Sequence, residues 1–122
     1  MNALEQRFSS GRVADVLGAI DTVCSWNYVG VEAPLKHTAT VLKMLVLAVA
    51  PFYAHGPQHV YVGPSKRGGM YARFFDKSGD EIIVFAHNDG RLFCAADGAS
   101  EYTTVDRVIE IVQEACLYAA LV

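Results

Sequence analysis

Features typical of secreted, disordered or membrane-spanning proteins are scarce in this sequence. Its three cysteines, Cys24, Cys94 and Cys116, stand far apart in apolar segments and form no CxxC or Cys/His cluster. Such cysteines behave as small buried hydrophobes in a reducing compartment, not as disulfide partners or metal ligands. Only 19% of the 122 residues are charged and 52% are hydrophobic. This composition argues against disorder.

Long apolar runs are also missing. The longest, Met44 to Ala54, is eleven residues long and contains Pro51, whereas a membrane-spanning helix needs about 20 residues. The first residues lack the basic-then-apolar pattern of a signal peptide. We therefore expect a cytoplasmic protein without a membrane partner. Its length predicts a single domain over residues 1–122.

The charges are few and unevenly distributed. Residues 1–75 carry a net charge of +3, and residues 76–122 carry −6. This polarity can orient a charged partner on the surface. It is too weak for a surface that binds nucleic acid, so we do not expect a nucleic-acid partner.

Helical periodicity is present in both the first half of the chain and its C-terminal part. Apolar residues recur at helical spacing in three segments, which we predict to be helices: 13–24, 34–52 and 105–119. Pro34 suits the first turn of the second helix, and Thr103 or Thr104 can cap the third. From Met44 onward the second helix is apolar on every side, which predicts a helix buried at the centre of the fold.

Strand patterns fill the region between the second and third helices. We predict four strands, at residues 59–62, 70–75, 81–86 and 92–96. Glycine-containing breaks separate them, which is typical of hairpins in an antiparallel meander. Residues 2–8 are expected to form a short turn, and residues 97–100 to leave the sheet. The predicted order is α-α-β-β-β-β-α, an α+β fold.

The predicted sheet is apolar on both faces, although a sheet with one face in water should alternate between apolar and polar residues. Two arrangements would cover the second face: helices pack on both sides, or the face is left for a partner chain. In the second arrangement aromatic and arginine side chains would carry most of the binding energy. These anchors are Tyr71, Arg73, Phe75 and Phe93.

The loop at residues 63–69 is rich in glycine and contains two adjacent cations, Lys66 and Arg67. Because a strand rather than a helix follows it, a solvated hairpin loop is favoured over a phosphate-binding loop. In a complex with a partner, Lys66 and Arg67 would set the orientation.

The sequence shows no strong metal-binding or catalytic motif. His55 and His59 have i, i+4 spacing, but a Gly-Pro pair breaks the helix between them and no third ligand stands nearby, so neither a metal nor another cofactor is expected. Motifs for serine hydrolases, zinc proteases and phosphate loops are absent. A Cys94 nucleophile with His87 as its base is conceivable, but the apolar surroundings of Cys94 would raise its pKa and lower its reactivity.

These observations favour a non-enzymatic protein that acts by occupying a surface of a protein partner. Small inhibitors of the immunity, antitoxin and phage anti-defence classes act in this way. The alternative is a homodimeric sensor of a small molecule or nucleotide, with the sheet as its self-association surface and the ligand beside the 63–69 loop. A second alternative is a small enzyme that uses His87 and Cys94.

Overall fold

The computed structural model describes residues 3–8, 12–53, 58–75, 81–96 and 99–121. Within these residues the elements follow in the order β1 (Leu4–Phe8), α1 (Val13–Cys24), α2 (Lys36–Tyr53), β2 (Gln58–Pro64), β3 (Gly69–Phe75), β4 (Glu81–His87), β5 (Leu92–Ala96), β6 (Ala99–Thr103) and α3 (Val105–Leu121). The predicted α+β class is confirmed. The sheet has six strands, however, where the sequence pattern predicted four.

The six strands are all antiparallel, and their order in the sheet is their order in the chain, from β1 to β6. The two strands missing from the prediction are β1, in the segment expected to be a turn, and β6, in the segment expected to leave the sheet. Both are edge strands of five residues. Edge strands in natural proteins are often short and carry polar or charged residues, which prevents pairing with other chains, so they show little apolar alternation.

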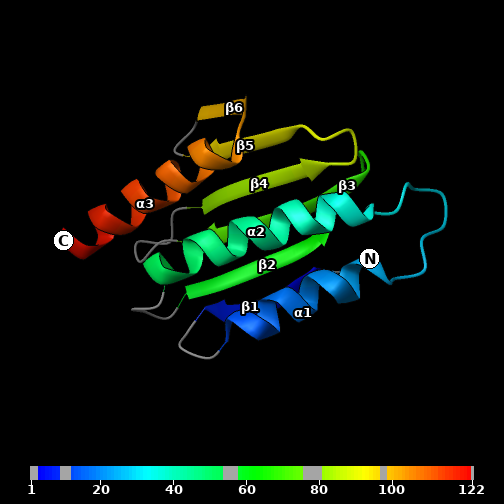
Figure 1. Ribbon diagram of the computed structural model, residues 1–122, viewed down its shortest axis with the longest axis horizontal. Coiled ribbons are helices and arrows are strands. Elements are labelled where there is room, and N and C mark those ends of the chain that lie inside the picture. The colour runs from blue at the N-terminus through cyan, green and yellow to red at the C-terminus, as the bar shows by residue number, and fades with distance from the viewer. Residues whose placement is uncertain (1–2, 9–11, 54–57, 76–80, 97–98, 122) are drawn as a thin grey trace.

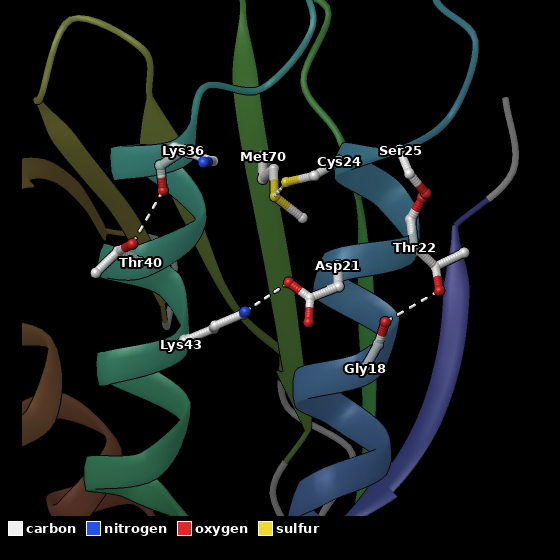
Figure 2. Close-up of polar contacts among 9 residues, drawn as sticks. All are labelled: Gly18, Asp21, Thr22, Cys24, Ser25, Lys36, Thr40, Lys43 and Met70. Atoms are coloured by element: carbon white, nitrogen blue, oxygen red, sulfur yellow. Dashed lines mark hydrogen bonds and ion pairs between the residues drawn. The ribbon is translucent and has the colours of Figure 1, made fainter.

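The three helices lie side by side in one layer against one face of the sheet (Figure 1). Helix α1 packs on β1 and β2, α2 on β3 and β4, and α3 on β5. An ion pair between Asp21 and Lys43 joins α1 to α2 (Figure 2). The Cys24 thiol contacts the Met70 sulfur at 3.6 Å, which joins α1 to β3 (Figure 2).

The core lies between this helical layer and the sheet. Alternate side chains of the strands enter it; in β4 these are Ile82, Val84 and Ala86. All three helices contribute to the same cluster, for example through Ile20 of α1 and Val108 of α3. Burial of these apolar side chains is the main favourable term in folding.

Helix α2 is central in the helical layer, but it is not enclosed as its composition predicted. Leu42, Leu45 and Val46 are fully buried, whereas Met44 and Leu47 are 55% and 54% exposed. In a two-layer fold the sheet covers one side of the middle helix and its neighbours cover two more. The fourth side faces outward, and the apolar residues there remain accessible.

A single side chain, Asn88, ties the connection between α1 and α2 to the β4–β5 turn. Its amide oxygen accepts hydrogen bonds from the Leu35 backbone N–H and the Thr38 hydroxyl, both at 2.9 Å. Its amide nitrogen donates to the carboxylate of Glu32 at 3.0 Å and to the carbonyl of Ala33 at 2.8 Å. All hydrogen-bonding groups of this amide are therefore used within the fold.

No helix among the described residues has both the length and the hydropathy needed to cross a membrane.

Candidate functional site

The sheet has a second surface, formed by the side chains of β2–β6 that point away from the helices; we call it the open face. In the part of the chain that the structure describes, all three helices pack on the opposite side. The helix-facing side chains of β3 and β4 are buried, and those on the open face are partly exposed. Of the two predicted arrangements, the described structure has the one in which the helices leave the second face uncovered.

A row of four aromatic side chains crosses the open face from β3 to β6; we call it the aromatic row. Its members are cross-strand partners in register: Tyr71, Phe85, Phe93 and Tyr102. The ring centroids of successive members are 6.1, 6.2 and 5.2 Å apart, with tilted and edge-on geometry. Contacts of this kind between aromatic rings are favourable beyond the area that they bury.

Gly63 of β2 makes space for the first member of this row. A Cβ atom at Gly63 would lie 2.7 Å from the hydroxyl oxygen of Tyr71 and 2.8 Å from the nearest carbon of its ring. The Tyr71 ring therefore lies across β2, and partial burial raises the pKa of its hydroxyl. The glycine extends the aromatic row over one more strand.

A second row, two residues along each strand, lies beside the first; we call it the low row. Its members are also cross-strand partners: Arg73, Ile83, Ala95 and Ser100. Toward β6 these side chains become small, whereas the aromatic row keeps full-sized rings. The open face is therefore uneven on β5 and β6, where the rings of Phe93 and Tyr102 lie beside a trough at the small side chains of Ala95 and Ser100.

Arg73, at the β3 end of the low row, has its charge balanced within the fold. Its guanidinium donates to Glu81 at 2.8 Å, and this hydrogen bond raises the pKa of Arg73 above its ordinary value. The guanidinium also lies 5.7 Å from the ring centroid of Tyr61 and 5.5 Å from that of Phe75, within the range of cation–π contacts. The Arg73 side chain is thus held in place before any partner arrives.

At one end the open face continues into a hollow of about 340 Å³. The residues that line it come from the α1–α2 connection, the β2–β3 and β4–β5 turns, and strands β4 and β6: Glu32, Arg67, His87, Asn88, Asp89, Arg91 and Tyr102. The Arg91 guanidinium lies 4.8 Å from the Tyr102 ring centroid and pairs with Asp89 at 2.8 Å. Hydrogen bonding from the Arg91 backbone N–H holds the pKa of Asp89 below its usual value. The positive charges of Arg67 and Arg91 equal in number the negative charges of Glu32 and Asp89, so the hollow has no net formal charge.

The structure brings most of the predicted binding residues together. Tyr71, Arg73 and Phe75 lie on the open face as alternate residues of β3. Phe93 lies on the same face in β5, with Phe85 of β4 between it and Tyr71. The two predicted orienting cations, Lys66 and Arg67, are exposed in the turn between β2 and β3, and Arg67 lines the hollow.

Three aromatic residues of this surface were missing from the predicted set: Tyr61, Phe85 and Tyr102. Phe85 alternates with the buried Val84 and Ala86, and this pattern was sufficient to place it on the open face. Tyr102 could not be assigned to the face, because the strand that carries it was not predicted.

The structure does not bring His87 and Cys94 together. His87 follows Phe85 on the open face, where the two rings stack with centroids 6.2 Å apart. Cys94 points into the core on the other side of the sheet, and burial raises the pKa of its thiol. The arrangement considered for a cysteine nucleophile with a histidine base is therefore absent from the structure.

Within the described part of the chain, no three or more His, Cys, Asp or Glu side chains are grouped so that they could hold a metal ion. His55 lies outside the described residues, and of His59 only the backbone position in β2 is described.

No protein-family model matches the chain, and no curated protein and no solved structure matches it.

Proposed function

We propose that this chain is a protein-binding domain that docks a protein partner on its open face. The observation that carries this proposal is the aromatic row: four aromatic side chains in register on a face that the described helices leave uncovered. Aromatic and arginine side chains are enriched among the residues that dominate binding energy at protein interfaces.

The packing of the face supports this role. The rings of the aromatic row contact one another, and Arg73 is held by Glu81 and by two rings. Side chains that are already ordered lose little conformational entropy when a partner covers them. The open face is thus arranged for docking without rearrangement of the sheet.

An inhibitor of the immunity, antitoxin or phage anti-defence class would use such a face to cover part of its target. The exposed cations Lys66 and Arg67, beside the hollow, would then orient the target relative to the sheet. In this proposal the chain acts by occupying a surface and carries out no chemical step.

The test compares the wild type and two double variants as immobilised baits in an extract of the native cell. Untagged copies of the chain are added to the extract, so that capture of a second copy is also detected. One carries Tyr71→Ala and Phe93→Ala on the open face. The other carries Met44→Ala and Leu47→Ala, which removes exposed apolar side chains from the helical layer. Circular dichroism and thermal unfolding first establish that both variants are folded.

We expect a protein that the wild-type and helix-face baits capture equally and that the open-face bait retains at least about tenfold less, the loss typical of an interface anchor. Equal capture by all three baits, or loss only with the helix-face bait, would contradict the proposal.

The hollow favours a second candidate function, binding of a small molecule or nucleotide. It lies beside the loop where the sequence suggested a ligand, and Arg67, His87 and the Tyr102 ring line it. Calorimetric titration with nucleoside monophosphates tests this candidate. It predicts binding to the wild type and at least about tenfold weaker binding to Arg67→Ala; no heat of binding to the wild type would eliminate a site for these nucleotides.

A further inference from the structure

We infer that the partner seated on the open face is a second copy of this chain, packed sheet against sheet. This inference rests on the proposed function and names its partner.

On β5 and β6 the relief of the open face is complementary to itself, because aromatic rings there lie beside small side chains. The aromatic row and the low row run side by side across the strands, two residues or about 6.6 Å apart. A two-fold axis that runs between the rows, parallel to both, turns the aromatic row of one copy over the low row of the other. The strands of the two sheets then stay close to parallel or antiparallel, as in aligned sheet packing.

Each residue of the aromatic row then faces the low-row residue of the same strand in the other copy. Phe93 lies over Ala95, and Tyr102 lies over Ser100, where small side chains leave space for a ring. At the other end Tyr71 lies over Arg73, a pairing of ring and cation. The contact is isologous, as a closed dimer requires, because each copy supplies both members of every pair.

The charges of the two rows permit this approach. Arg73 is the only formally charged residue in the aromatic and low rows, and Glu81 neutralises it within the same copy. Two identical faces therefore meet without like-charge repulsion at their centre. The exposed cations Lys66 and Arg67 lie in the turn at the end of the strands, away from the axis.

The area of the face fits a dimer of modest strength. Strands β2–β6 have five to seven residues each, so the face measures about 20 Å in each direction and roughly 400 Å² in flat projection. This projection is about half of the ~800 Å² that each partner buries in a standard interface, which places the dimer among the small, weak interfaces. We therefore expect a dimer with a dissociation constant on the order of micromolar.

Sedimentation equilibrium of the purified chain over about 1–200 μM tests the inference. We expect the wild type to shift from the 13.3-kDa monomer to twice that mass. The substitution Ala95→Arg fills the trough and should weaken the dimer at least about tenfold. Its control, Leu47→Arg, places the same charge on the exposed side of α2 and should leave the dimer intact.

Crosslinking tests the position of the two-fold axis. A thiol crosslinker that spans about 10 Å, the spacing of packed sheets, is added to a mixture of Ser100→Cys and Tyr102→Cys chains. We expect crosslinked peptides that join position 100 of one chain to position 102 of the other, above the background of either variant alone. A dimer that survives Ala95→Arg or yields no 100–102 product would overturn the inference.

The two proposals fail differently. A wild type that stays monomeric at 200 μM overturns the second-copy inference, while face-dependent capture of another protein would still support the proposed function. If neither the chain itself nor any captured protein binds in a way that depends on Tyr71 and Phe93, both are overturned.

Discussion

At the scale of single residues, Gly63 shows how an absent side chain can shape a surface. It pairs with Tyr71 across β2 and β3, and the tyrosine ring occupies the volume that a Cβ atom would need. A glycine weakens the strand that contains it, but it does so less when a neighbouring aromatic ring covers it, because the ring shields the backbone.

The substitution Gly63→Ala should lower the free energy of unfolding by about 1–3 kcal/mol, because the new methyl group overlaps the Tyr71 ring. In a Tyr71→Ala background the same change should cost clearly less, since the overlap is gone. Urea denaturation of the four proteins measures this coupling. Gly18→Ala is the matched control: open space surrounds this position in α1, so an alanine should stabilise by about 0.5–1 kcal/mol. A cost at Gly63 that does not change when Tyr71 is removed would contradict the assigned ring position.

Asn88 is the residue on which the connection between α1 and α2 most depends. Its substitution by alanine removes four side-chain hydrogen bonds and leaves the hydroxyl of the buried Thr38 without its acceptor. We expect Asn88→Ala to lower the free energy of unfolding by about 2–3 kcal/mol. The adjacent Asp89→Ala should cost much less than Asn88→Ala, because Asp89 is exposed and bonds only Arg91 among the described residues. Chemical denaturation that gave equal costs at the two positions would show that Asn88 does not join these segments.

At the scale of elements, the strongly periodic segments were predicted well and the short edge strands were not. The predicted helix at 13–24 coincides with α1, and the predicted strand at 70–75 differs from β3 by one residue. Strands β1 and β6 were missed, because five residues with polar members carry too little alternation to be read without their sheet neighbours. Strand pairing formed these elements, and pairing is not a local property of the sequence.

Helix α3 begins where the sequence placed its cap. The Thr104 hydroxyl accepts a hydrogen bond from the Arg107 backbone N–H at 3.3 Å, the bond that an N-cap residue makes. We expect Thr104→Ala to lower the free energy of unfolding by about 1 kcal/mol and Thr104→Ser to keep most of that stability. Thermal or urea unfolding compares the two variants. If serine were no better than alanine, the hydroxyl would not be capping the helix.

At the scale of the whole molecule, the arrangement of the layers decides what the chain can do. Strand alternation predicted that Tyr71, Arg73 and Phe75 share one face of the sheet, and they do. Alternation could not show whether a helix would cover that face, because periodicity identifies the apolar side of each helix and not the surface on which it packs. In the structure each of the three helices takes the same side of the sheet. Because the helices share that side, the aromatic row on the other side is left uncovered.

The proposed function requires that the aromatic row, which is partly exposed in the single chain, becomes covered by a protein partner. Hydroxyl-radical footprinting across a dilution series, read by mass spectrometry, tests it most directly by comparing Tyr71, Phe85 and Phe93 with the fully buried Phe74. At submicromolar concentration we expect the three to be oxidised much faster than Phe74. Their oxidation should fall several-fold as the partner, a second copy in our inference, covers the face. Oxidation as slow as that of Phe74 in the dilute monomer would contradict the account.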